Sequence, residues 1–270
     1  QIFDDQRLVV FGAGTAGTGM ADQIAAAMQR GGLSEKDARS RVWLIDKQGL
    51  VTDDMQNLPD YQQPYARPAA EVSEWGGHPI DLLTVVQQVK PTILIGTSTA
   101  HGAFTRDVIE ALSAGVERPI LLPLSNPTSR IEVMPQDAIP WSKGQALMAT
   151  GIPIAPVEYD GVRYQIGQGN NALLYPGLGL GTIVCGAARV TDGMLLAAAE
   201  AVAGQVDVSE RGASLLPDVA NLRASSATVA IAVAKAAAAD GVATVQHDDL
   251  VQAVQTAMWQ PVYPASLPGA

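Results

Sequence analysis

Three glycines stand at fixed spacing directly after the first apolar run of this chain. The run Val9-Val10-Phe11 leads into Gly12-Ala13-Gly14-Thr15-Ala16-Gly17, which has the pattern G-x-G-x-x-G and is followed by a helical stretch. In a strand–turn–helix unit, the first glycine permits a tight turn, the second lets a pyrophosphate approach the backbone, and the third lets the helix pack closely on the strand. The pattern predicts a dinucleotide site, with a close-packed turn that binds no ligand as the alternative.

An acidic residue stands where such a site needs one. Asp46 ends the apolar run Val42-Trp43-Leu44-Ile45, 34 positions after Gly12 (46 − 12). A carboxylate at the end of the second strand accepts hydrogen bonds from the adenosine ribose, usually about 20 residues after the glycines. The longer spacing requires a long first helix, and a solvated strand-end acid is the alternative interpretation.

Polar loops follow two later apolar runs. Thr97-Ser98-Thr99 comes after Ile93-Leu94-Ile95, and Ser125-Asn126-Pro127 comes after the run that ends at Leu124. Ligands of parallel sheets bind at the carboxyl ends of strands, so these loops are candidates for lining the site. Ser125-Asn126-Pro127 is also consistent with a simple turn, and His101 is assigned no chemical role.

A second amide-rich segment, Gly167-Gln168-Gly169-Asn170-Asn171, is interpreted as a turn. Its paired asparagines either form the turn alone or bind a carboxylate without adding charge. The chain contains no H-E-x-x-H, G-x-S-x-G or Walker motif, and the single cysteine, Cys185, lies in an apolar helical stretch that predicts a core position. No catalytic acid, catalytic base or metal site is therefore predicted.

The elements that position these residues alternate between short apolar runs and helical stretches. The predicted strands are residues 8–11, 42–45, 93–95, 120–124 and 146–149, and the predicted helices are residues 16–29, 80–89 and 107–114. This alternation predicts an α/β fold, a Rossmann-like, doubly wound, mostly parallel sheet. The polar stretch 49–77 is expected to be a long surface loop.

Additional C-terminal elements are expected after residue 150. Residues 157–164, with Asp160-Gly161 at the centre, predict a β-hairpin, and residues 176–188, 192–203, 224–239 and 248–258 predict helices. We interpret residues 1–270 as one domain, in which 1–150 form the alternating half and 151–270 add the hairpin, the amide-rich turn and the helices.

Composition restricts the class of protein. The 270 residues carry a formal net charge of −10, which makes nucleic acid an improbable partner. Hydrophobic residues make up 47%, but no run approaches 18 apolar residues, so no membrane helix is expected. The first residues, QIFDDQ, are not a signal peptide, and a cytoplasmic location is expected by default.

These motifs together resemble malic enzymes, and most closely the bacterial NAD-dependent type. The resemblance covers roughly residues 6–262 and includes Trp259-Gln260 near the end. The segments that carry it are Gly12 to Gly17, Asp46-Lys47-Gln48-Gly49-Leu50, Lys90 to Gly96, Pro123 to Thr128, Gly167 to Asn171 and Tyr175-Pro176-Gly177.

The resemblance implies oxidative decarboxylation of L-malate to pyruvate and CO₂ with NAD and Mg²⁺ or Mn²⁺. Asn126 and one of Asn170 and Asn171, preferably Asn171, would contact malate and the nicotinamide side. Gln62 lies where NADP-dependent relatives tend to have a lysine, and a neutral Gln62 together with an anionic Asp46 disfavours the 2′-phosphate of NADP and so favours NAD. The implied cofactor-binding residues are Gly12, Gly14, Thr15, Ala16, Gly17, Asp46, Lys47, Gln62, Thr97, Ser98 and Asn126.

In the family, the tyrosine acid, the lysine base and the acidic metal ligands lie upstream of the glycine-rich turn. The chain is therefore expected to be the NAD-binding domain alone, inactive without an N-terminal catalytic domain and forming a dimer or tetramer as family members commonly do. Two other functions stay open. One is malolactic enzyme, which converts L-malate to L-lactate, and the other is a non-catalytic NAD(H)-binding or sensing domain.

Overall fold

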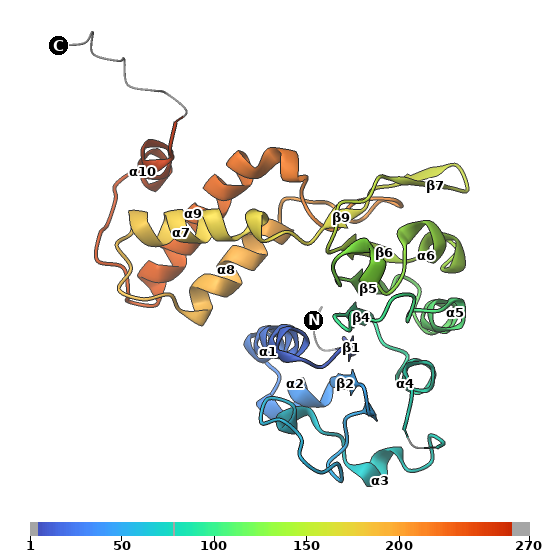
Figure 1. The fold of residues 1–270 in the computed structure, drawn as a ribbon. Coiled ribbons are helices and arrows are strands. Elements are labelled where there is room, and N and C mark those ends of the chain that lie inside the picture. The colour runs from blue at the N-terminus through green and yellow to red at the C-terminus, as the bar shows by residue number, and fades with distance from the viewer. Residues whose placement is uncertain (1–4, 78, 261–270) are drawn as a thin grey trace, which may run out of the picture. The chain divides into compact units, whose positions relative to one another are not determined.

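The computed structural model describes residues 5–77 and 79–260, and these residues form two compact units (Figure 1). Unit 1 contains the chain up to Gly169 together with Val206–Leu216, which we call the return segment. Unit 2 contains Asn170–Gln205 and the chain from Pro217 onward. Each unit is described separately below.

A seven-stranded sheet forms the centre of unit 1 among the described residues, in the order β3-β2-β1-β4-β5-β6-β9. Every neighbouring pair is parallel except β2 and β3, so the predicted mostly parallel α/β class is confirmed. The strands are β1 Leu8–Phe11, β2 Val42–Asp46, β3 Gly49–Leu50, β4 Ile93–Gly96, β5 Ile120–Pro123, β6 Leu147–Thr150 and β9 Gly167–Gln168.

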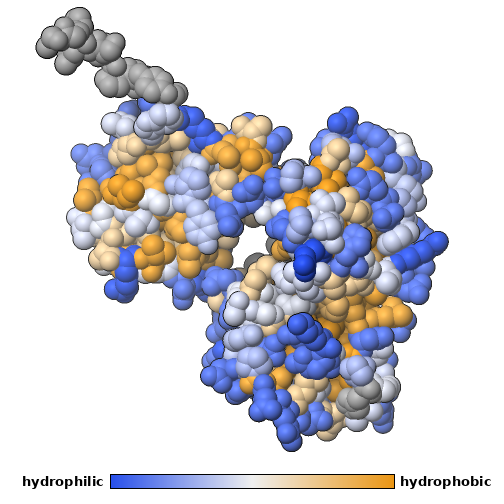
Figure 2. All heavy atoms as spheres, viewed as in Figure 1, coloured by the Kyte–Doolittle hydropathy of each residue, from blue (hydrophilic) through white to orange (hydrophobic). Residues whose placement is uncertain are grey.

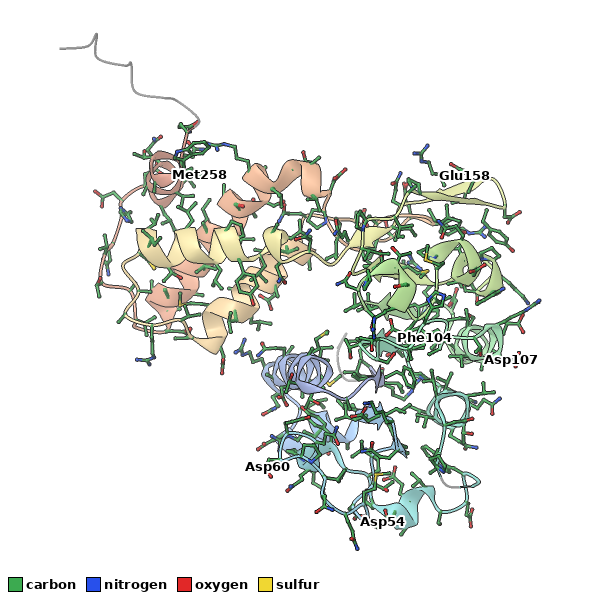
Figure 3. The ribbon with its side chains drawn as sticks, in the orientation of Figure 1. Asp54, Asp60, Phe104, Asp107, Glu158 and Met258 are labelled. Atoms are coloured by element: carbon green, nitrogen blue, oxygen red, sulfur yellow. The ribbon has the colours of Figure 1, made fainter. Side chains whose placement is uncertain are left out.

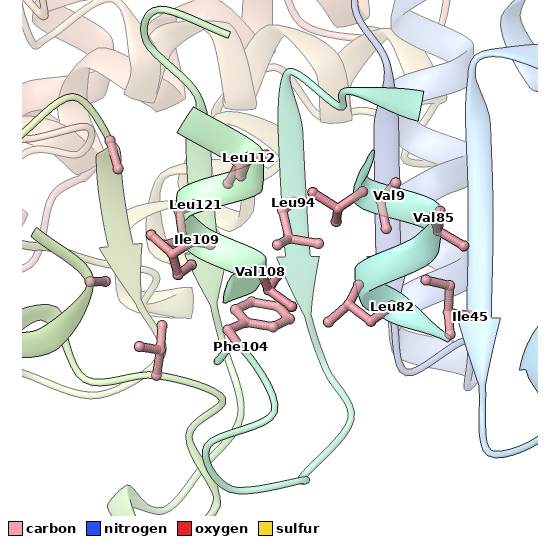
Figure 4. Packing of buried hydrophobic residues seen from close by; sticks show 14 of the residues in the cluster. Val9, Ile45, Leu82, Val85, Leu94, Phe104, Val108, Ile109, Leu112 and Leu121 are labelled. Carbon is pink, nitrogen blue, oxygen red and sulfur yellow. The ribbon is translucent and has the colours of Figure 1, made fainter. Parts of the chain in front are cut away.

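Helices cover both faces of this sheet because alternate residues of each buried strand point to opposite faces. The row formed by Trp43, Val9, Leu94 and Leu121 packs on one face against α4 and α5 (Figure 4). The next row, which includes Val10, packs on the other face against α1. The helices of unit 1 are α1 Thr15–Arg30, α2 Glu35–Ser40, α3 Ala69–Val72, α4 Leu82–Val89, α5 Arg106–Gly115 and α6 Pro135–Trp141.

The prediction of a long surface loop over residues 49–77 holds for the many exposed and irregular residues of this segment, but the segment also contains short elements and buried side chains. Strand β3 pairs antiparallel with β2, a 3₁₀ helix spans Gln63–Tyr65, and α3 follows. Tyr65 is buried, and its hydroxyl donates to Asp22 Oδ1 at 2.6 Å. Burial, reinforced by this hydrogen bond, raises the pKa of Tyr65. Parts of this polar segment are therefore packed, because buried side chains such as Tyr65 find hydrogen-bond partners inside the protein.

The predicted hairpin is confirmed, with β7 at Val157–Tyr159 and β8 at Val162–Tyr164. The prediction of a plain turn at 167–171 needs correction, because Gly167–Gln168 is strand β9 and Asn171–Leu173 is a 3₁₀ helix. The return segment lies beside these elements. The Gln165 amide donates to Gly212 O at 2.9 Å, and Arg118 Nη2 donates to Val208 O at 2.5 Å.

Unit 2 is helical in its described residues, with α7 Tyr175–Val184, α8 Asp192–Ala203, α9 Leu222–Ala239 and α10 Leu250–Ala257. Helix α9 packs against α7 and α8, and a Cβ atom on Gly177 of α7 would lie 2.5 Å from Val229 Cβ. Cys185 is buried, as predicted. Residues Val219–Ala239 have the length and hydropathy of a membrane span. Apolar residues also reach the surface of this unit (Figure 2). Among the exposed large hydrophobic residues is Ile183, whose exposed fraction is 77%.

Candidate dinucleotide site

The three glycines of the first turn have different physical reasons to be glycine. Gly12 has a φ of +104°, and a Cβ atom there would lie 2.5 Å from Ser98 N. A Cβ atom on Gly17 would lie 2.3 Å from Gly12 O. Gly14 has an ordinary φ of −73°, and a Cβ atom there would meet nothing within 4 Å. The protein's own packing therefore requires Gly12 and Gly17 but not Gly14, whose missing side chain leaves room for a ligand.

Helix α1 presents its N-terminus at this turn. Gly14 is the N-cap residue, no side chain caps the helix, and no acidic residue occupies its first turn. The first helical hydrogen bond runs from Thr18 N to Gly14 O at 2.9 Å, so the preceding amides of Thr15 to Gly17 lie before the helical ladder begins. Unused amides and the positive end of the helix dipole attract an anion such as a pyrophosphate.

The structure brings Asp46 and Gln62 together beside the glycine-rich turn. Gln62 Nε2 donates to Asp46 Oδ2 at 2.9 Å and to Ala13 O at 2.6 Å. Gln62 is 1% exposed, and its Oε1 atom has no hydrogen-bond partner among the described residues. Asp46 Oδ1 accepts from the amide of the exposed Lys47 at 2.9 Å. Gln62 thus fixes the Asp46 carboxylate relative to the turn.

The long spacing between Gly12 and Asp46 is explained by two helices instead of one. Helix α1 has 16 residues, and α2 adds a further 6 before β2 begins. Asp46 still ends β2 next to β1, because Phe11 pairs with Ile45. The acid therefore stands at the strand end next to the glycine-rich turn, where a ribose acceptor is needed.

Thr97, Ser98 and Asn126 lie at the ends of the next two strands. Thr97 Oγ1 donates to Gly12 O at 2.7 Å, which joins the loop after β4 to the glycine-rich turn. Asn126 is exposed after β5, and the peptide bond between Asn126 and Pro127 is cis. The strand order therefore places the predicted residues of unit 1 along the carboxyl-terminal ends of the parallel strands.

A cavity of about 550 Å³ extends from these strand ends, and its volume is within the range of small-molecule sites. Gly12, Asp46 and Ser98 line its polar part, and side chains from α4 and α5 line its apolar part. The sequence analysis missed the apolar walls, which are Phe11, Ile45, Pro79, Leu82, Leu83, Ala100, Ala103 and Val108. This lining suits a ligand that carries both apolar and polar groups.

Glu132 is a further residue that the sequence analysis missed. It is fully buried, and its carboxylate accepts hydrogen bonds from Ser98 and Ser125, while Phe104 N donates to its backbone oxygen at 3.1 Å (Phe104 is labelled in Figure 3). A lone acid between Ile131 and Val133, two apolar residues, is the signal in the sequence that indicates such a buried carboxylate.

Asn170 and Asn171 belong to unit 2, whereas Asn126 belongs to unit 1. Asn170 Oδ1 accepts from Ala172 N at 2.9 Å, so its oxygen caps the 3₁₀ helix that begins at Asn171. Asn171 is exposed. Of the two, Asn171 has the side chain better placed to meet a ligand from solvent.

No three His, Cys, Asp or Glu side chains come together as a metal site within residues 5–77 and 79–260. The carboxylates nearest the cavity are Asp46 and Asp81, which lie at the ends of different elements and have local hydrogen-bond donors. The polar groups of this site therefore suit hydrogen bonding to a dinucleotide.

Asp81 caps helix α4 at the wall of the cavity, and Asp81→Ala is expected to lower the free energy of unfolding by about 1 kcal/mol at neutral pH. Its Oδ1 accepts from Thr84 N at 2.9 Å, and this hydrogen bond holds the pKa of Asp81 below its usual value of 3.8. The part of the stabilisation that depends on the ionised carboxylate is therefore fully present well above pH 3.8 and is lost as the pH falls through the lower, folded-state pKa.

Urea unfolding of wild type and Asp81→Ala across this pH range measures the effect. The stability difference between wild type and Asp81→Ala should decrease under acid conditions, because only the part that depends on the ionised carboxylate is lost, and Asp81→Asn, which retains the cap oxygen without titrating, should stay close to wild type at neutral pH. A stability difference between wild type and Asp81→Ala that does not change with pH would contradict this account of the cap.

The chain matches known proteins over most of its length. Residues 1–238 match the family model described as "Malic enzyme, NAD binding domain". NAD-dependent malic enzyme 3 of Bacillus subtilis is 56% identical over 263 residues, which cover 96% of this chain and 46% of that protein. The malolactic enzyme of Lactococcus lactis subsp. lactis is 45% identical over 259 residues, with coverages of 96% and 48%. The chain thus spans about half the length of these relatives.

A solved structure, the malic enzyme from Pyrococcus horikoshii, has a similar fold. Its TM-score is 0.72 at 23% identity, and the match covers 94% of this chain and 53% of that chain. At this identity the likeness shows the fold alone. The match to the family model over residues 1–238 is what shows that this chain belongs to the malic enzyme NAD-binding domain family.

Proposed function

We propose that this chain is the NAD(H)-binding part of an NAD-dependent malic enzyme that oxidises and decarboxylates L-malate to pyruvate and CO₂. The observation that carries the proposal is Gly14, a glycine that the fold itself does not need, at the uncapped N-terminus of α1. The 56% identity to NAD-dependent malic enzyme 3 of Bacillus subtilis supports the choice of reaction.

Each residue of the site has a role in this proposal. The amides of Thr15 to Gly17 hold the pyrophosphate, Asp46 accepts from the adenosine ribose, and the apolar wall formed by Ile45, Pro79, Leu82 and Leu83 receives the adenine. When bound, NAD supplies the acceptor for the hydride from malate. Asn126 and Asn171 orient the substrate carboxylate and the nicotinamide through neutral amide groups.

The remaining chemistry is proposed to come from the part of the longer protein that this chain does not span. Removal of the hydroxyl proton requires a base, and the developing enolate requires a cation such as Mg²⁺ or Mn²⁺. The relatives are about twice as long as this chain, which leaves room for both. We therefore propose that the isolated chain binds NAD and does not turn over malate.

Cofactor preference provides the direct test of the site. We expect the wild-type chain to bind NAD at least about tenfold more tightly than NADP, because a 2′-phosphate would meet the Asp46 carboxylate. The double variant Asp46→Ser, Gln62→Lys should shift the preference toward NADP by about 1–3 kcal/mol, the range of charge-assisted hydrogen bonds. Isothermal titration calorimetry with both cofactors measures this shift.

A matched control adds the same charge at the next position. Gln63 is exposed, and its Nε2 atom donates to Leu58 O and to Asp60. The double variant Asp46→Ser, Gln63→Lys therefore changes the net charge by the same amount without placing the added cation beside position 46. It should produce a smaller shift toward NADP. Equal wild-type affinity for NAD and NADP would refute the role assigned to Asp46.

Malolactic activity is the second candidate, since the Lactococcus lactis malolactic enzyme matches 96% of this chain at 45% identity. Both activities use the same dinucleotide site, so binding experiments do not separate them. Release of NADH from malate and NAD by the longer protein supports malic enzyme activity, whereas production of lactate without NADH release supports malolactic activity.

A further inference from the structure

Glu132 is the one acidic side chain that is fully buried within residues 5–77 and 79–260. A buried carboxylate is costly unless hydrogen bonds or an opposite charge compensate for the lost water. No Lys, Arg or His among the described residues forms an ion pair with Glu132. Its compensation must therefore come from neutral donors.

Those donors come from two loops that are far apart in the sequence. Glu132 Oε1 accepts from Ser98 N at 2.9 Å, from Ser98 Oγ at 2.8 Å and from Ser125 Oγ at 2.5 Å, and Ser125 N lies 3.4 Å from Oε2. Thr99 N also donates to Ser125 Oγ at 2.9 Å. One carboxylate thus joins the loop after β4 to the loop after β5.

The absence of a side chain at Gly96 provides the space for this carboxylate. Gly96, the last residue of β4, lies directly against it, and a Cβ atom on Gly96 would be 2.6 Å from Glu132 Cδ. Gly96 has no positive φ, so close approach and not backbone conformation accounts for the glycine. Gly96 and Glu132 therefore fit one another as a pair.

The strand order shows which part of a dinucleotide these two loops would face. Asp46 ends β2, the glycine-rich turn follows β1, and the joined loops follow β4 and β5, in that spatial order. With the adenosine ribose at Asp46 and the pyrophosphate at the turn, the second nucleoside lies over the ends of β4 and β5. In NAD this second nucleoside carries the nicotinamide.

We propose that Glu132 is a positioning residue for the nicotinamide half of NAD. It does not touch the cofactor but holds the loops after β4 and β5, which include Ser98 and Asn126, in the arrangement that receives the nicotinamide riboside. This inference rests on the proposed function, because it assumes that NAD occupies the site. Glu132 belongs neither to the glycine-rich pattern nor to the polar loops from which other site residues were predicted.

The test separates the two halves of the cofactor by calorimetry on the 270-residue chain. NAD probes the whole site, whereas ADP probes only the adenosine and pyrophosphate part. Glu132→Gln keeps the shape of the side chain but replaces one acceptor oxygen with an NH₂ donor, which opposes a serine N–H. We expect the Kd for NAD to rise about tenfold and the Kd for ADP to change less than twofold.

Two further variants guard against an effect of folding alone. Ser125→Ala removes one of the donors without altering Glu132 and should weaken NAD binding more than ADP binding. Ser142→Ala is the control, since Ser142 is also buried and its hydroxyl bonds Ile139 O and lies 3.4 Å from Ala146 N, away from the joined loops. It should bind both nucleotides as wild type does.

The outcomes are distinguishable. Selective loss of NAD affinity in Glu132→Gln, or in Ser125→Ala should Glu132→Gln not fold, supports the inference. Equal weakening of NAD and ADP, or unchanged binding of both in folded variants, overturns it and leaves the proposed function intact. Failure of the wild-type chain to bind NAD overturns the proposed function, and this inference with it.

Discussion

Gly14→Val is expected to abolish measurable NAD binding while the chain stays folded. Nothing in the protein lies within 4 Å of a Cβ atom at this position, and the backbone φ of −73° is accessible to valine. The added side chain therefore occupies the space through which a pyrophosphate reaches the amides of α1. Calorimetry should detect no binding, whereas thermal unfolding should occur close to the wild-type temperature.

Gly19→Val provides the control within the same helix. Gly19 is exposed in α1, and a Cβ atom there also meets nothing within 4 Å. The same three carbon atoms are thus added away from the helix N-terminus. We expect Gly19→Val to bind NAD normally, and unchanged affinity in Gly14→Val would disprove the assignment of the pyrophosphate site.

The second prediction with a large expected effect concerns malate turnover. We expect no malate turnover by the 270-residue chain and measurable turnover by the longer protein. Asn126 and Asn171 are amides, which do not accept a proton at neutral pH, and no metal-binding group of three acidic, His or Cys residues exists among the described residues. NADH absorbance during incubation with malate, NAD and Mn²⁺ measures the rate.

The longer protein also tests the substrate role of the amide-rich turn. In it, Asn171→Ala should raise the KM for malate more than the KM for NAD, and Asn170→Ala serves as the comparison because its side-chain oxygen caps a 3₁₀ helix. Steady NADH production by the 270-residue chain alone would place the proton acceptor and the metal ligands among residues described above as structural.

The strands and the glycine-rich turn were predictable from the sequence because their signals are local. Residues 8–11 and 42–45 are continuous apolar runs, as expected for strands buried on both faces, and the structure places β1 and β2 there. Asp46 was identifiable because it follows such a run directly. These features depend on neighbours within a few positions along the chain.

The parts that were missed depend on partners distant in sequence. Gln62 was identified as a site residue, but its burial was not predicted, because the hydrogen bond that compensates for burial goes to Ala13, 49 positions away. Glu132 depends in the same way on Ser98, 34 positions earlier. Strands β3 and β9 have two residues each, too short for any periodic pattern, and form only because a longer strand lies beside them.

The return segment affects the order in which the protein assembles during synthesis. Residues 170–205 must be translated between strand β9 and the segment that lies beside it, an interval of 36 residues. At 5–20 residues per second this takes about 2–7 seconds. During that time the hydrogen bond from Gln165 N to Gly212 O cannot form, and Leu216 is not yet in place beside Gly167. The sheet edge of unit 1 is therefore completed only after the ribosome has made the first helices of unit 2.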